Sequence, residues 1–211
     1  MNVIFLGAPG AGKGTQAERI SALLGIPTVS TGAMIREAIK NGTEMGRQAS
    51  AYTERGALVP DEVVNGIVKE RLSQADCRKG WILDGFPRTL PQAEALKKMR
   101  IRVDAVVSLE IADEKIVDRM TGRRVCPECG ETYHVTSNPS PAGDRCGKCG
   151  AALTVRRDDA PEVVLSRLEV YHAQSEPLKE YYKKKVVTVD ADAPLDTITD
   201  EILRALGAKK A

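Results

Sequence analysis

The chain has 211 residues, of which 28% are charged, and its 31 basic and 29 acidic residues leave a net charge of +2. That length suits one α/β domain with insertions and allows a full hydrophobic core. The small net charge argues against binding to nucleic acid or to an anionic membrane through a strongly basic surface.

The sequence contains no apolar run of the length that a membrane-spanning helix needs, about 18 residues or more. Its N-terminus also lacks the basic region, the long apolar core and the small-residue cleavage site of a signal peptide. We therefore expect a cytoplasmic protein, whose cysteines stay reduced.

Five short apolar runs alternate with helical patterns along the chain. The runs lack strict alternation of polar and apolar residues, which is typical of parallel strands covered on both faces. Alternating strands and helices predict an α/β fold with a parallel, right-handed, doubly wound sheet. We expect its five strands at Val3–Leu6, Thr28–Val29, Trp81–Leu83, Ala105–Leu109 and Val186–Val189.

Apolar residues at helical spacing predict the helices between these strands. Pro60 and Pro161 precede or open two of them, and Pro177 is expected to kink or end the helix that Pro161 opens. The apolar stripe of that helix is expected to contain Val164, Leu165, Leu168 and Tyr171. The other predicted helices are Thr15–Leu24, Asp61–Ala75, Leu90–Met99, Asp113–Met120 and Leu195–Leu206.

Two stretches depart from the strand–helix alternation. Residues 30–60 contain helix-like pieces, and we expect a small helical excursion there, interrupted by Gly32, Gly42, Gly46 and Gly56. Residues 122–159 contain β-like pieces at 131–135 and 151–155. This second stretch predicts a compact β insertion that is too small to be held together by apolar burial alone.

Residues 7–15 carry the G-x-x-x-x-G-K pattern of a phosphate-binding loop, directly after the first apolar run. Glycines let backbone N–H groups turn toward a di- or triphosphate, the following helix adds the positive end of its dipole, and Lys13 adds a point charge. The hydroxyl stands one place later than in the generic pattern. We expect the phosphates to be bound by Gly10, Ala11, Gly12, Lys13, Gly14 and Thr15.

Four of the five cysteines form two C-x-x-C pairs with sixteen residues between them. In a reducing compartment this spacing predicts a tetrahedral thiolate zinc site rather than disulfides. Four thiolates leave no position open for water, so the site is expected to be structural. The expected ligands are Cys126, Cys129, Cys146 and Cys149. Fe²⁺ and Co²⁺ are alternative occupants, and Cys77 is expected to be a small, partly buried residue.

A second polar cluster follows the run Trp81–Leu83. Asp84 is expected at the carboxyl edge of the sheet, where α/β folds bind ligands, and beside a phosphate loop it is placed to hold Mg²⁺ directly or through water. Arg88, held by Gly85 and Pro87, can bind a phosphate through two N–H groups. Taken alone, Asp84 fits better as a helix cap or as the ion-pair partner of Arg88.

The loop at residues 7–15 with Gln16, the run Asp84–Arg88 with Gln92, and the cysteine pairs together closely resemble adenylate kinase in its long bacterial form with a zinc-bearing lid. The likeness covers essentially the whole chain, and the Gly14–Thr15 ending agrees with it. The resemblance implies a sheet of the P-loop NTPase type, a monomer, and reversible phosphoryl transfer from Mg-ATP to AMP that gives two ADP.

The same resemblance implies a domain organisation and a set of site residues. The core would be residues 1–29, 60–121 and 160–211, with an AMP-binding domain at 30–59 and a zinc-binding lid at 122–159. Besides the loop, ATP would contact Arg119, Arg123, Thr132, Tyr133 and Leu195. AMP would contact Thr31, Arg36, Ala57, Leu58, Val59, Gly85, Phe86, Pro87, Arg88, Gln92, Arg156 and Arg167. The catalytic residues would be Lys13, Asp84, Arg88, Arg123, Arg156 and Arg167, with Asp158 and Asp159 orienting the arginines.

Three other functions are weighed against this one. The nearest is a kinase for GMP, UMP/CMP or dTMP, against which the pair Thr31 and Gln92 favours adenine. A GTPase-type switch would carry an N-K-x-D motif, which the sequence lacks. An ATPase whose zinc ribbon binds nucleic acid would need a basic, aromatic-rich surface, whereas aromatic residues make up 4% of the chain.

Overall fold

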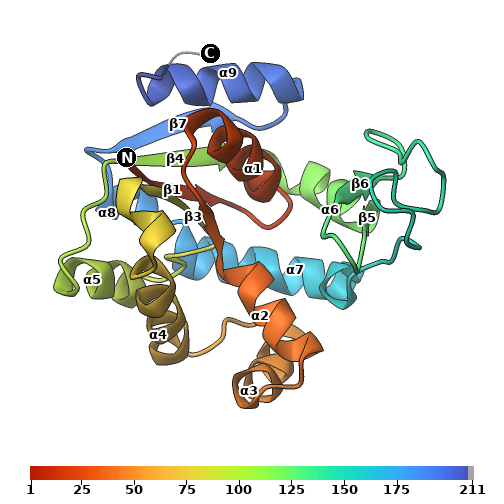
Figure 1. Cartoon of the computed structure of the whole chain (residues 1–211), viewed down its shortest axis with the longest axis horizontal. Coiled ribbons are helices and arrows are strands. Elements are labelled where there is room, and N and C mark those ends of the chain that lie inside the picture. Colours follow the sequence, from red (N-terminus) through yellow and green to blue (C-terminus); the bar gives the residue numbers. More distant parts are fainter. Residues whose placement is uncertain (209–211) are drawn as a thin grey trace.

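A five-stranded parallel sheet with strand order β2-β3-β1-β4-β7 forms the centre of the computed structural model, which describes residues 1–208 (Figure 1). The predicted sheet and all its predicted strands are confirmed, each slightly longer than expected. The strands are β1 (Asn2–Gly7), β2 (Thr28–Ser30), β3 (Trp81–Asp84), β4 (Ala105–Glu110) and β7 (Val186–Asp190).

Helices cover both faces of this sheet (Figure 1). Alternate residues of β1 belong to two different cores, because successive side chains of a strand point to opposite faces. Val3 and Phe5 pack with α1 (Lys13–Leu24) and α9 (Leu195–Ala205). Ile4 and Leu6 face the other core, which is covered by α4 (Asp61–Leu72), α5 (Leu90–Lys98) and α8 (Leu178–Tyr181).

A third, smaller core lies beside the phosphate loop. It joins Ala8 to Ile116 and Met120 of α6 (Asp113–Thr121) and to Val164 and Leu168 of α7 (Pro161–Val170). Helix α7 continues into a π-helical turn, Tyr171–Ser175, and α8 begins after Pro177, as the proline predicts.

The prediction that Leu165 belongs to the apolar stripe of α7 is wrong, because its side chain is 54% exposed. Val164 and Leu168 are four residues apart and share one face, whereas each step along a helix turns about 100° and carries Leu165 off that face.

The excursion at residues 30–60 forms two packed helices, α2 (Thr31–Lys40) and α3 (Glu44–Thr53). Two of the four predicted interruptions are wrong, since Gly32 and Gly46 lie inside these helices. Gly46 is needed for packing: a Cβ there would lie 2.1 Å from the Ala38 carbonyl oxygen. Gly42 and Gly56, with φ of +62° and +72°, follow the helix ends as expected.

Helix α4 ends at Leu72, three residues earlier than predicted, and a 3-10 helix at Ala75–Lys79 buries Cys77. The insertion at residues 122–159 is built on an antiparallel pair, β5 (Arg123–Val125) and β6 (Thr132–His134). Strand β6 was expected and β5 was not, and the piece at 151–155 contributes only isolated bridges. Among the helices of residues 1–208, none has the length and apolar character needed to cross a membrane.

Candidate active site

The phosphate loop joins β1 to α1 and opens toward the carboxyl edge of the sheet. Gly10 and Gly12 adopt φ values of +84° and +93°, a region that suits glycine, and they turn the chain into the first turn of α1. Lys13 Nζ donates hydrogen bonds to the carbonyl oxygens of Gly7 and Ala8 at 2.7 and 2.8 Å. Burial lowers the pKa of Lys13 to about 8, against the opposing attraction of Asp84.

Asp84 lies beside this loop, at the end of β3. It is in register with Ser30 of β2, whose hydroxyl donates a hydrogen bond to Asp84 Oδ2 at 3.1 Å. A Cβ placed on Gly14 would lie 3.6 Å from the same oxygen, so the first turn of α1 passes directly by the carboxylate. A carboxylate here faces the position at which the loop would hold phosphates, and carboxylate oxygen is a ligand that Mg²⁺ prefers.

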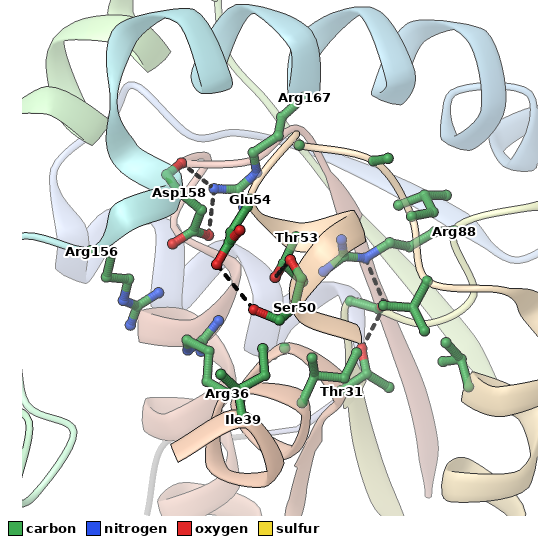
Figure 2. Close-up of a pocket in the computed structure, with 18 of the residues that line it drawn as sticks. Thr31, Arg36, Ile39, Ser50, Thr53, Glu54, Arg88, Arg156, Asp158 and Arg167 are labelled. Carbon is green, nitrogen blue, oxygen red and sulfur yellow. Dashed lines mark hydrogen bonds and ion pairs between the residues drawn. The ribbon is translucent and has the colours of Figure 1, made fainter. Parts of the chain in front are cut away.

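A cavity of about 360 Å³ lies between the excursion at residues 30–60 and the core. Figure 2 labels Arg36, Arg88, Arg156 and Arg167 around it, and Arg157 also lines it. Burial, reinforced by repulsion from Arg123 and Arg36, lowers the pKa of Arg156 to about 9. Burial also lowers the pKa of Arg88, with repulsion from Arg167 adding to it. Such a concentration of buried cations marks a site for an anion.

A second, smaller cavity adjoins the first. Lys13 lines it together with Arg88 and Arg167, and both arginines also line the larger cavity. The phosphate loop and the arginine-rich cavity therefore share a wall. Among the residues that the structure describes, no histidine or cysteine lines either space.

Two neighbouring carboxylates pair with Arg167. Asp158 and Asp159 lie in the 3-10 helix Arg157–Asp159, where the insertion returns to α7. The Asp158 carboxylate accepts a hydrogen bond from Arg167 Nη1 at 2.8 Å, and that nitrogen also donates to the Asp158 carbonyl oxygen at 2.9 Å. Burial acts to raise the pKa of Asp158, but attraction to the surrounding arginines, Arg167 most of all, lowers it below its usual value.

Arg88 is positioned by the turn that follows Asp84. Its Nε donates to the Gly85 carbonyl oxygen at 2.9 Å, and the same oxygen accepts a hydrogen bond from the Thr31 hydroxyl at 2.8 Å. Gly85 has a φ of +78°, and a Cβ there would lie 3.0 Å from Arg88 Nη2 and 3.1 Å from Thr31 Oγ1. Glycine thus lets both side chains approach the turn.

Gln92 lies almost fully buried at the edge of the large cavity, and its partners were not foreseen from the sequence. Its Oε1 accepts a hydrogen bond from the Arg88 backbone N–H at 2.7 Å, and its Nε2 donates to Asp61 Oδ1 at 2.7 Å. Asp61 also accepts from the Thr89 hydroxyl. The only sequence signal for Asp61 and Thr89 is their position at helix starts, which by itself predicts capping.

The remaining predicted site residues are spread over the large cavity, the loop between β7 and α9, the start of α9 and the insertion at residues 122–159. Ala57, Leu58 and Val59 line the large cavity, as do Thr31 and Gly85. Arg119 Nη2 donates to the Ala191 carbonyl oxygen at 2.9 Å, on the loop between β7 and α9.

The Leu195 carbonyl oxygen accepts a hydrogen bond from Gln16 Nε2 at 3.0 Å, which ties the start of α9 to the phosphate-loop helix. Tyr133 is buried in the small core of the insertion, where its hydroxyl lies 3.5 Å from Cys146 Sγ. The predicted contacts of Thr132 and Tyr133 with a base stay predictions.

The four paired cysteines converge in the insertion, and their sulfur atoms all lie within 4.8 Å of one another. The Cys126–Cys149 and Cys129–Cys146 sulfur pairs are 3.4 and 3.5 Å apart. These separations are close to the edge of a tetrahedron with metal–sulfur bonds of about 2.3 Å, which is about 3.8 Å. The residues present therefore fit a tetrahedral metal ion.

Both cysteine pairs use the same turn. Gly130 N donates to the Cys126 carbonyl oxygen at 3.1 Å, and Gly150 N donates to that of Cys146 at 2.8 Å. The two glycines have φ of +78° and +77°. A hydrogen bond from Tyr133 is the largest of the effects that lower the pKa of Cys146 to about 6, whereas hydrogen bonds from neighbouring cysteine side chains contribute to raising the pKa of Cys149.

Comparison with known proteins is consistent with this geometry. The family model described as adenylate kinase matches residues 5–187. The chain is 51% identical to the adenylate kinase of Caldicellulosiruptor saccharolyticus over 99% of this chain and 100% of that protein. It is 53% identical to the adenylate kinase of Archaeoglobus fulgidus over 93% and 92% of the two chains, and 49% identical to that of Thermodesulfovibrio yellowstonii over 99% and 100%.

Proposed function

The chain belongs to the adenylate kinase family, and on that premise we propose how its residues share the reaction. The enzyme transfers the terminal phosphoryl group of ATP to AMP and forms two ADP. The observation that carries the assignment is the wall, containing Arg88 and Arg167, that the two cavities share. We place the ATP phosphates at the loop and AMP in the large cavity, so that the reacting groups meet at this wall.

On the donor side, the loop backbone and Lys13 hold the ATP phosphates. Lys13 leaves the carbonyl oxygens of Gly7 and Ala8 for the outer phosphates, since a hydrogen bond between two charged groups is stronger than one to a neutral carbonyl. Asp84 holds the Mg²⁺ ion that accompanies ATP, directly or through water. When bound, this ion neutralises charge on the outer phosphates. Arg119, Arg123 and Leu195 also contact ATP, and Thr132 and Tyr133 lie near its base.

On the acceptor side, the cavity separates the two ends of AMP. Arg36 and Arg88 bind its phosphate, because guanidinium groups match phosphate oxygens with paired N–H donors. The segment at residues 57–59 and Gln92 bind the adenine base. Thr31 and Gly85 complete the cavity wall, whereas Pro87 lines the smaller cavity and the fully buried Phe86 lines neither.

Transfer needs alignment and neutralisation of charge more than proton chemistry. A loose transition state spreads negative charge over the oxygens of the transferred group. Arg123, Arg156 and Arg167 stabilise that charge from fixed positions, so little reorganisation is needed at the moment of reaction. Direct transfer fits the walls of the two cavities, which among residues 1–208 contain arginine and lysine but no histidine or cysteine.

We assign residues 122–159 as a lid and residues 30–59 as the AMP-binding domain. The remaining residues form the core, of which residues 209–211 lie outside the part of the chain that the structure describes. Lys40 Nζ donates to the Pro127 carbonyl oxygen at 3.2 Å, and Arg157 lies 3.6 Å from Glu54, so the two domains touch. Closure of the lid excludes water, which would otherwise compete with AMP for the phosphoryl group.

We assign Zn²⁺ to the four thiolates and give it a structural role, because four sulfur ligands leave no position for a substrate. Reduced thiols are typical of a reducing compartment, so we place the enzyme in the cytoplasm. The resemblance to adenylate kinase supports a monomer.

A coupled assay with Mg-ATP as donor and AMP, GMP, UMP, CMP or dTMP as acceptor tests the assignment of the base site. AMP is expected to give the highest kcat/KM. Preference for any other acceptor would refute the assignment of adenine to the cavity beside Gln92.

A further inference from the structure

The side-chain amide of Gln92 is held in one orientation by the protein itself. Its Nε2 faces the Asp61 carboxylate and its Oε1 faces the Arg88 backbone N–H, each at 2.7 Å. A carboxylate only accepts hydrogen bonds and a backbone N–H only donates them. The chemistry of these two partners therefore settles which end of the amide is oxygen and which is nitrogen.

Asp61 is itself fixed by a closed ring of hydrogen bonds. Its second oxygen accepts from the Thr89 hydroxyl at 3.0 Å, and Thr89 Oγ1 accepts from the Gln92 backbone N–H at 3.2 Å. Gln92 is 2% exposed and Thr89 is 8% exposed. The ring joins the start of α4 to the start of α5, and Asp61 lines neither of the two cavities.

The amide keeps one donor and one acceptor for a ligand. Within residues 1–208, the second N–H of Nε2 and the second lone pair of Oε1 have no protein partner, and Gln92 lines the large cavity. Adenine presents an acceptor at N1 beside a donor at its 6-amino group. A 6-oxopurine presents the reverse, a donor at N1 beside an acceptor at O6. With its NH₂ toward N1 and its oxygen toward the 6-amino group, the Gln92 amide matches adenine. An amide turned over matches the 6-oxopurine instead.

We propose that Asp61 is a positioning residue that makes the acceptor site select 6-aminopurine monophosphates over 6-oxopurine monophosphates. It does so by preventing the Gln92 amide from turning over, and this role rests on the proposed binding of the base by Gln92. Turning the amide would place its oxygen against the carboxylate and its NH₂ against the Arg88 N–H. Both hydrogen bonds would be lost and like groups would face each other in a buried place, which is costly.

The test compares AMP with IMP, which differs from AMP only at position 6 and at N1. The ratio of kcat/KM for the two acceptors is measured, with Mg-ATP as donor, in the wild type and in Asp61→Asn and Asp61→Ala. Asparagine has nearly the same shape but can donate to Gln92 Oε1, so residue 61 no longer selects one orientation of the amide, and only the Arg88 N–H still opposes its turning. We expect the AMP/IMP ratio to fall about tenfold in both variants, while the KM for ATP stays within about twofold of the wild type.

Glu62→Gln is the matched control. It removes a carboxylate from the next position in the same helical turn, where the side chain is exposed, and is expected to leave the ratio unchanged. Melting temperatures confirm that each variant is folded. If the ratio stays constant in both Asp61 variants, or if the KM values for AMP and IMP rise in step, Asp61 only holds the two helices together and the proposal fails.

Gln92→Ala separates this inference from the proposed function. An unchanged AMP/IMP ratio in Gln92→Ala would show that Gln92 does not read the base, which refutes the base assignment itself. A ratio that collapses in Gln92→Ala but persists in both Asp61 variants would refute the positioning role alone.

Discussion

Both carboxylate oxygens of Asp159 accept hydrogen bonds from the guanidinium of Arg123. Arg123 Nε donates to Asp159 Oδ2 at 2.8 Å, and Arg123 Nη2 donates to Asp159 Oδ1. The Asp159 side chain has no exposed surface, and its Oδ1 lies 3.8 Å from Arg167 Nη1. One buried carboxylate thus sets the position of two arginines that belong to different segments.

Replacing this carboxylate is expected to slow phosphoryl transfer. In Asp159→Asn, the amide cannot accept from both donor groups of Arg123, so the guanidinium shifts away from the transferred group. Misplacement of a positioning group by about 1 Å costs about 10²-fold in rate, and we expect a loss of that order in kcat. Steady-state kinetics measures it, with Asp144→Asn, an exposed site in the lid, as control. Full turnover in Asp159→Asn would contradict the role.

Arg88→Ala is expected to lower kcat by about 10²–10³-fold, the size found when one charge-stabilising donor is removed. Arg88→Lys keeps the charge but lacks paired N–H donors, so its kcat is expected to lie between those of the wild type and alanine enzymes. The control is Arg78→Ala, at an exposed position on the 3-10 helix that follows α4. Near-full turnover of Arg88→Ala would show that this residue is misassigned.

The activity is expected to depend on the charge of Lys13. Because burial lowers its pKa to about 8, the free enzyme loses the ammonium as the pH rises through that value. The charged form binds the phosphates, so kcat/KM for ATP, which reports the free enzyme, falls above pH 8. Bound phosphates favour the ammonium, so kcat falls only at higher pH. A flat kcat/KM up to about pH 9.5 would contradict this expectation.

Removal of the metal is expected to unfold the lid while the core stays folded. Metal binding supplies much of the folding free energy of a small metal-bound module, on the order of 10 kcal/mol for zinc fingers. In calorimetry, adding a chelator is expected to lower the melting temperature of the lid and to leave that of the core unchanged. The variant Cys126→Ser is expected to give the same profile. Cys77→Ser, outside the cluster and buried in the main core, is expected to leave the lid transition unchanged. An unchanged profile after confirmed metal loss would refute the prediction.

A pair of glycines tests the close packing of α2 and α3. In Gly46→Ala, the new methyl group would lie 2.1 Å from the Ala38 carbonyl oxygen, so the helices must separate. We expect a loss of about 1–3 kcal/mol in the free energy of unfolding. Gly66→Ala lies in α4, where the new Cβ would meet nothing within 4 Å beyond its own helical turn, and it is expected to stabilise by about 0.5–1 kcal/mol. Urea titrations that give both variants the same sign would contradict this.

The features predicted correctly from the sequence are those that short segments determine. A buried run of apolar residues gives a strand, and two C-x-x-C pairs lie close enough along the chain to meet. The strands of the sheet and the convergence of Cys126 with Cys146 were therefore foreseeable.

The features that were missed arise from packing between distant segments. Asp61 and Gln92 are far apart in the sequence, and only the meeting of α4 with α5 joins their side chains. The sequence alone predicts that Gly46 interrupts a helix, because the close approach of the Ala38 carbonyl oxygen arises only in the folded chain. Leu165 was predicted to be buried because its hydrophobicity does not show which face of α7 other elements cover, or how wide that covered face is.

The small core that joins the phosphate loop to α6 and α7 packs the loop against both ends of the insertion at residues 122–159. A Cβ on Gly10 would lie 2.7 Å from Met120 Cγ, and Ala8 packs in the same core as Met120 and Val164. The lid leaves the core at the end of α6 and returns at the start of α7. The phosphate loop and the two ends of this insertion therefore share one packed core, so a bulkier residue at position 10 would displace Met120 and disturb the packing of both.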